Sequence, residues 1–201
     1  MKRLLLVLCL VLSASPWLHA EKLSADELKR ASDHLKKTSA ALLAATSGLS
    51  AAQWEFKPGP TRWSVAEVTE HLAAAEDMLM GMIKDKVMVA PARTEAANLK
   101  EIDDFVVTAI ADRTNKVQAA EPLMPTKRFG SPENSLKHFK ESRAKTLAFL
   151  NDTKDLRDHA VESPLGKKLD AYQWLLFISA HTERHTKQIN EVKADSNFPK
   201  K

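Results

Sequence analysis

The stretch Trp63-Ser-Val-Ala-Glu-Val-Thr-Glu-His-Leu72 carries the clearest helix start in the chain. Ser64 and Glu67 have the spacing of a capping box, in which each side chain accepts a hydrogen bond from the other residue's backbone N–H. The tryptophan before the cap can pack onto Val68 as a hydrophobic staple. The face that follows is apolar apart from one histidine: Val68, His71, Leu72, Ala75, Met78, Leu79 and Met82. This pattern predicts a helix over residues 64–88, with the methionines of that face filling gaps in the core.

Further helix starts lie on both sides of this stretch. Before it, Ser24-Ala-Asp-Glu27 is a second capping box, and its helix ends near Gly48. After it come an amphipathic stretch over 99–117, a helix from Ser131-Pro132 to about 150, and a last helix from Asp170 to about Lys193. Glycine is scarce, and almost nothing alternates with period two. We therefore predict an all-α bundle of four long helices, with an additional short helix in the long connection between 64–88 and 131–151.

The first twenty residues have the composition of a secretion signal. Lys2 and Arg3 precede an apolar run over 4–12, and smaller, more polar residues lead to Ala20. The run is far shorter than the roughly 20 residues that a membrane-spanning helix needs, and no later stretch comes close. We therefore expect a signal peptide at 1–20, a single domain over 21–201 without a membrane span, and a periplasmic or secreted location.

Cysteine and charge exclude several classes of function. The only cysteine, Cys9, lies in the expected signal, so the mature chain has no disulfide, thiolate metal site or cysteine nucleophile. Without Lys2 and Arg3 the 30 basic residues become 28, against 26 acidic ones. The lysines are interspersed with acids on solvated helix faces and form no basic stripe, which disfavours nucleic-acid binding.

Three histidines are the strongest indication of chemistry. His181 and His185 are four residues apart on the predicted last helix, so both rings project from one face. That face also carries Trp174, Ile178, Gln188 and Val192, and His71 has the equivalent place on the helix over 64–88. Three neutral imidazoles from two helices could bind a divalent ion and leave a coordination position open. The alternative is that core hydrogen bonds satisfy these histidines. A zinc-protease motif is disfavoured, because Glu183 lies two positions after the first histidine and faces away.

The same two segments resemble the DinB-like superfamily, which includes the YfiT-type metal-dependent hydrolases. The resemblance rests on the block 63–72 together with His181-Thr-Glu-Arg-His185-Thr-Lys-Gln188-Ile, and it spans about residues 24 to 199. It implies a four-helix bundle with up-down-down-up connectivity and a three-histidine site for a divalent metal, which falls on His71, His181 and His185. Activities in the family include hydrolysis and thiol-dependent transfer. The secretion signal disfavours thiol transfer, because the thiol cofactors of the relatives are cytosolic.

Together these observations predict an exported protein that binds a divalent metal, zinc first, with nickel, iron or manganese as alternatives. The expected activity is hydrolysis or group transfer on a small molecule. Glu67, one turn before His71, is a candidate general base, although its capping-box role competes. Gln188, one turn after His185, is a candidate for orienting a ligand ring or bound water, or else a plain amide at the core edge. The alternatives are a non-catalytic metal- or small-ligand-binding envelope or stress protein, and a purely structural bundle. A homodimer through an exposed helix face is a further expectation.

Overall fold

The computed structural model describes residues 22–94 and 97–200, and the expected signal peptide lies outside these ranges. Four long helices dominate the fold: α1 (Ala25–Thr46), α3 (Val65–Met82), α5 (Pro132–Asp152) and α6 (Ala171–Lys193). The shorter elements are α2 (Ala51–Glu55), a π-helical turn η1 (Ile83–Val87), α4 (Leu99–Ala111), a 3-10 turn η2 (Glu121–Leu123), β1 (Ala160–Glu162) and β2 (Lys168–Asp170). The all-α prediction is confirmed.

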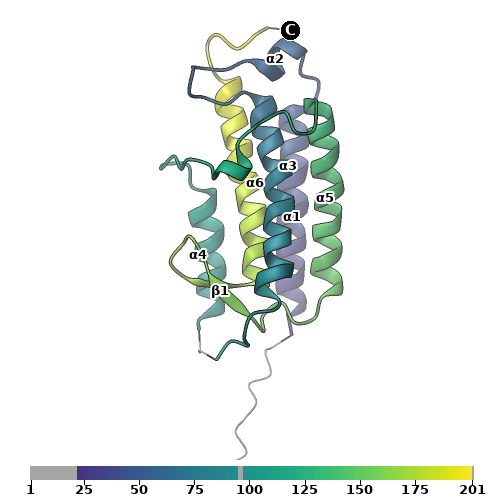
Figure 1. The fold of residues 1–201 in the computed structure, drawn as a ribbon, viewed down its shortest axis with the longest axis vertical. Helices are drawn as coiled ribbons and strands as arrows, with labels where there is room; N and C mark the ends of the chain where they lie inside the picture. The colour runs from purple at the N-terminus through teal and green to yellow at the C-terminus, as the bar shows by residue number, and fades with distance from the viewer. Residues whose placement is uncertain (1–21, 95–96, 201) are drawn as a thin grey trace, which may run out of the picture.

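The four long helices form a bundle with up-down-down-up connectivity (Figure 1). α1 and α6 run toward the end that carries α2 and the C-terminus, and α3 and α5 run the opposite way. α1 packs against α6 and α5, and α3 packs against α5 and α6, which closes a ring of four. α4 lies in the connection between α3 and α5 and packs on the outer side of α6. In the described part of the chain, no helix has the length and hydropathy to cross a bilayer.

Local capping explains where the long helices begin. Ser24 with Glu27, Ser64 with Glu67 and Asp170 with Gln173 each form a reciprocal capping box, and the Ser131 side chain accepts from the Asn134 N–H. Trp63 packs against the core cluster that contains Val68, as the staple predicts. A further box, Ser50 with Gln53, begins the short helix α2, which the sequence pattern did not reveal.

Arg143 of α5 joins all four long helices at the centre of the bundle. Its guanidinium forms two hydrogen bonds to the Glu76 carboxylate of α3, at 2.7 and 2.8 Å. It also donates to Thr182 of α6 at 2.8 Å and to the Leu35 carbonyl of α1 at 2.8 Å. Arg143 and Glu76 are each only 2% exposed, so the pair is desolvated. This network connects α3 to α6, the two helices that carry the three histidines.

Two predictions from the helix patterns are wrong: the end of α4 and the burial of Met78. α4 ends at Ala111 rather than near 117, because the Asp112 side chain accepts from the Thr114 N–H at 2.8 Å in a turn that competes with the helix. Val117, at the end of the expected helix, is 82% exposed. Met78 is 41% exposed rather than core filling, although the other methionine of that face, Met82, packs against the core.

A short hairpin precedes α6. β1 and β2 pair antiparallel, with Ala160 opposite Asp170, and Gly166 turns the chain with φ +67°. Each strand is three residues long, too short for alternation to appear in the sequence. The hairpin delivers Asp170 to the start of α6, where the buried Arg157 donates to Asp170 at 3.0 Å and to Asp103 of α4 at 2.9 Å. These bonds hold α4 and the first turn of α6 together.

Candidate metal centre

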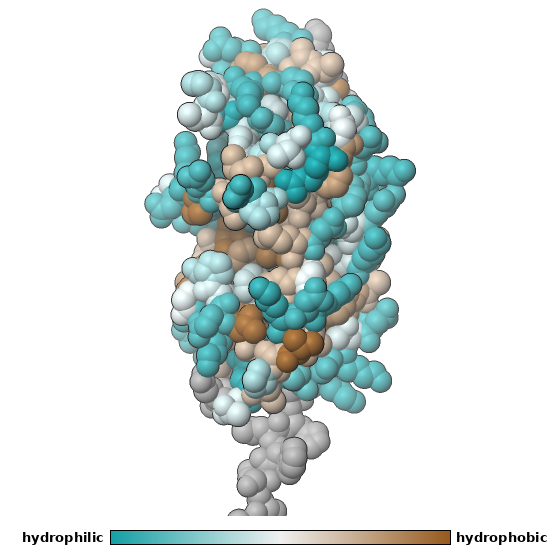
Figure 2. All heavy atoms as spheres, viewed as in Figure 1, coloured by the Kyte–Doolittle hydropathy of each residue, from teal (hydrophilic) through white to brown (hydrophobic). Residues whose placement is uncertain are grey.

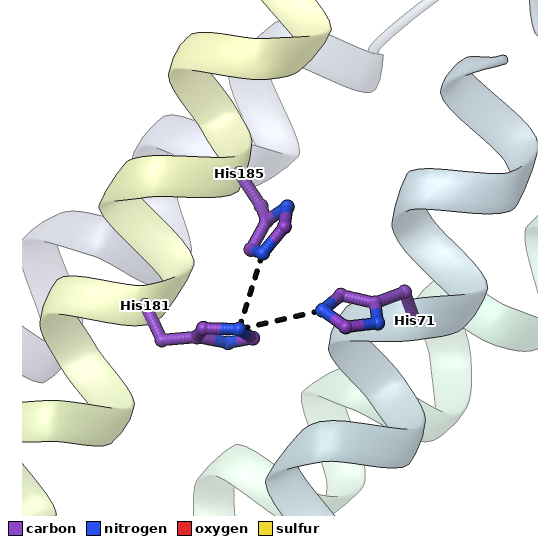
Figure 3. Close-up of side chains that lie close together, drawn as sticks. All are labelled: His71, His181 and His185. Atoms are coloured by element: carbon purple, nitrogen blue, oxygen red, sulfur yellow. Dashed lines mark hydrogen bonds between the residues drawn. The ribbon is translucent and has the colours of Figure 1, made fainter. Parts of the chain in front are cut away.

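The rings of His71, His181 and His185 meet between α3 and α6 (Figure 3). The Nε2 atom of His181 lies 3.3 Å from Nε2 of His71 and 3.1 Å from Nε2 of His185. The ligand atoms of the three rings all lie within 4.8 Å of one another. Histidine ligands 2.0–2.1 Å from a tetrahedral zinc ion are themselves about 3.3 Å apart. The nitrogen atoms thus have the spacing that a shared ion requires.

The outer nitrogens of two rings are held by acceptors. Nδ1 of His71 donates to the backbone carbonyl of Leu123 at 3.1 Å, and Nδ1 of His185 donates to Oε1 of Gln188 at 2.8 Å. Because a carbonyl or amide oxygen can only accept, both rings carry their proton on Nδ1. Their Nε2 atoms then present lone pairs toward His181, which is the form of imidazole that binds a metal.

Electrostatics favour the neutral form of all three histidines. Burial lowers the pKa of His71, which is 3% exposed. Desolvation by neighbouring side chains, with the nearby His71, lowers the pKa of His181 to about 3. Burial, with the two other rings, brings the pKa of His185 well below its ordinary value. A histidine must be neutral to bind a metal ion. Because these rings are already neutral near neutral pH, they can bind an ion without first releasing a proton to solvent.

The centre is covered at one end and open along one side. The segment that carries η2 lies over His71, and Leu123 and Ala119 pack there against Ala74 and Ala75. Met78 lies two turns beyond His71 on the same face of α3 and is exposed, so this cover is local. His181 is also partly exposed. In the view of Figure 2, a hollow with apolar surface lies between α4 and α3. His181 is thus the least buried of the three rings.

The comparisons with known proteins agree with this architecture. The sequence profile of the DinB superfamily matches residues 34–189. The chain belongs to the DinB superfamily.

Two individual relatives are similar to this DinB bundle. The uncharacterized protein YuaE of Bacillus subtilis (strain 168) is 29% identical over 147 residues, which cover 73% of this chain and 86% of the relative. Among solved structures, YfiT from Bacillus subtilis, described as a probable metal-dependent hydrolase with an unusual four-helix bundle topology, superposes with a TM-score of 0.57 at 16% identity. The match covers 89% of this chain and 93% of YfiT. At this identity the similarity to YfiT establishes the fold.

The two polar residues expected beside the histidines lie in different surroundings. Gln188 contacts His185 directly, and its Oε1 also accepts from Arg113 at 3.2 Å. The carboxylate of Glu67 accepts from the Ser64 N–H at 2.9 Å and from Lys57 Nζ at 2.7 Å. These are the contacts of a capping box with an ion pair, and the role of Glu67 as general base stays a prediction.

Sequence reasoning missed three groups of this DinB centre. The Leu123 carbonyl holds His71, but a backbone acceptor has no side-chain signature. Arg113, which binds Gln188, also forms two hydrogen bonds to Glu191 and comes from the loop after α4. Glu70 precedes His71 and binds the segment after η2. The sequence feature that could have pointed to Glu70 is its position next to His71, a candidate ligand.

Proposed function

We propose that this DinB bundle binds one divalent metal ion through Nε2 of His71, His181 and His185, with zinc as the first candidate and nickel, iron or manganese as alternatives. The observation that carries the proposal is the convergence of three Nε2 atoms, two of them on rings whose Nδ1 proton is held by an acceptor. In the metal-free chain a proton on Nε2 of His181 satisfies both neighbours, and it moves to Nδ1 when His181 becomes a ligand.

The proposed activity is hydrolysis or group transfer on a small molecule. A bound divalent ion would polarise a substrate or lower the pKa of bound water toward 7. The chain's own groups hold His71 and His185 in place and leave the His181 side open to solvent. The description of YfiT as a probable metal-dependent hydrolase supports the same reaction class. If Glu67 acts as general base, its carboxylate must first exchange its bond to Lys57.

A second candidate is a non-catalytic protein that binds a metal or a small ligand. The observation that favours it is the composition of the cluster: in the described ranges it contains three histidines and no carboxylate. Such a centre can hold an ion without a dedicated proton acceptor beside it.

We also propose that the protein is exported after removal of residues 1–20, on the strength of the charged start and apolar run. N-terminal sequencing of the protein isolated from cells tests this, and an intact Met1 would remove the export proposal.

Elemental analysis of the purified mature protein tests the metal centre. We expect one equivalent of a divalent metal, and loss of that metal in His181→Ala and in His185→Ala. His34→Ala is the matched control, because His34 is also partly buried but contacts Ser179 and Glu183 on another side of α6. Metal content unchanged in both site variants would exclude the centre. Assays of the metal-loaded protein with esters, amides and electrophile–thiol pairs then separate the candidates, and absence of turnover in every class favours the binding protein.

A further inference from the structure

Glu70 of α3 is a buried carboxylate with an unusual set of partners. It is 5% exposed, and it accepts hydrogen bonds from three consecutive backbone N–H groups: Thr126 at 2.8 Å, Lys127 at 2.9 Å and Arg128 at 3.1 Å. The Nε atom of Arg128 adds a fourth bond at 3.3 Å. Burial alone would raise the pKa of Glu70, but these donors hold its pKa below the ordinary value. Glu70 therefore anchors the segment 126–128 to α3 as a carboxylate.

The anchored segment is continuous with the group that orients His71. Leu123, whose carbonyl accepts from Nδ1 of His71, lies three residues before Thr126. Arg128, bonded to Glu70, also donates through Nη2 to the Met124 carbonyl at 2.7 Å. Glu70 and His71 are adjacent on α3, so two neighbouring side chains bind one segment at its two ends. The position of the Leu123 carbonyl thus depends on the bonds of Glu70.

The segment contains one residue in a disfavoured backbone conformation. Lys127 has φ +62°, in the left-handed region that side chains with a Cβ disfavour. Its N–H is one of the three that point at Glu70. Without the carboxylate, three backbone donors would lose their acceptor and Lys127 would be free to leave this conformation.

Glu70 has no free oxygen for another role at the centre. Both carboxylate oxygens accept backbone hydrogen bonds, and Glu70 is not among the residues whose ligand atoms cluster with the three histidines. A part as metal ligand or proton acceptor is therefore disfavoured, which leaves its effect on the covering segment.

Building on the metal centre proposed above, we propose that Glu70 is a positioning residue for His71. It holds segment 121–128 on α3 so that the Leu123 carbonyl keeps the proton of His71 on Nδ1 and directs Nε2 toward His181 and His185.

The test compares Glu70→Gln with the wild type in two measurements. Imidazole ¹⁵N NMR of the metal-free protein reads the tautomer of His71, which we expect as Nδ1–H in the wild type and as a mixture in the variant. Competition with a zinc chelator reads the zinc Kd, which we expect to rise about tenfold, the lower end of the range for groups that orient a ligand. A folded Glu70→Gln protein with the wild-type tautomer and a zinc Kd within twofold overturns the proposal.

Glu27→Gln is the matched control. Glu27 also accepts from a backbone N–H, that of Ser24, and from an arginine, Arg157, but it lies at the start of α1, with no contact to segment 121–128 among the described interactions. We expect Glu27→Gln to lower the thermal stability without changing the tautomer of His71 or the zinc Kd. An equal rise of the zinc Kd in both variants would attribute the effect to general destabilisation and overturn the proposal.

Arg128→Ala decides the question if Glu70→Gln does not fold. The Arg128 side chain is 31% exposed, so its loss is tolerated more easily, and it removes one bond to Glu70 and the bond to Met124. We expect a smaller shift of the tautomer in the same direction and a rise of the zinc Kd of less than about tenfold, because the three backbone bonds to Glu70 remain; a tautomer and a zinc Kd that are both unchanged overturn the proposal. A wild type that binds no zinc would refute the proposed function alone, because the NMR measurement on the metal-free protein still tests Glu70.

Discussion

Replacement of Gln188 by Ala tests whether the acceptor on His185 matters to metal binding. In the structure, Nδ1 of His185 donates to Oε1 of Gln188 at 2.8 Å, and His185 is 9% exposed. In the variant the free ring of His185 can rotate or exchange its tautomer, but the metal-bound ring must keep an unpaired N–H at Nδ1, which costs about 1–3 kcal/mol for a buried group. Because Gln188 itself is partly exposed, water replaces part of the bond, and we expect about 1.4 kcal/mol. That corresponds to a zinc Kd about tenfold higher.

The assay is competition with a zinc chelator near neutral pH, with thermal unfolding of the metal-free proteins measured alongside. Asn190→Ala is the control, since it removes an exposed amide from the same helix. Gln188→Glu should bind zinc at least as tightly as the wild type, because a carboxylate accepts from Nδ1 of His185 more strongly. A Gln188→Ala protein whose zinc Kd stays within twofold of the wild type would refute the reasoning.

Three further outcomes follow from the described contacts. Because neighbouring groups lower the pKa of His181 to about 3, this ring contributes stability that is complete above the ordinary pKa of 6.5 and is lost as the pH falls toward 3. The metal-free wild type should therefore lose more stability on acidification than His181→Asn, and parallel pH curves in thermal unfolding would contradict this. Arg143→Leu leaves the Glu76 carboxylate buried without its partner and should lower the free energy of unfolding by about 3–5 kcal/mol, measured in urea, whereas a loss below about 1 kcal/mol would show that water reaches Glu76. Lys127→Gly removes a side chain from a backbone at φ +62° and should raise the stability by up to about 1 kcal/mol, and a lower melting temperature would disprove this.

The candidate centre could be predicted in part because its spacing is local. His181 and His185 are four positions apart on one helix, so helical geometry alone places both rings on one face. The capping box at Ser64 sets the start of α3 and therefore which face of the helix carries His71. The helix pattern offered His71 as a third ligand, but the meeting of the two helices did not follow from spacing, and only the resemblance to the DinB-like superfamily implied it.

Local sequence patterns were enough to predict the four long helices, their starts and the pair of histidines, because caps and a 3.6-residue period act over a few neighbouring positions. Packing between distant segments sets which groups surround the three histidines. The acceptor on His71 is a backbone carbonyl 52 residues further along the chain, and any residue type could provide it. Met78 shares the face of His71 but is exposed. This difference also depends on tertiary packing, because the segment with η2 packs against Ala74 and Ala75. Contacts between distant segments are set by packing of the whole bundle, so no local pattern encodes them.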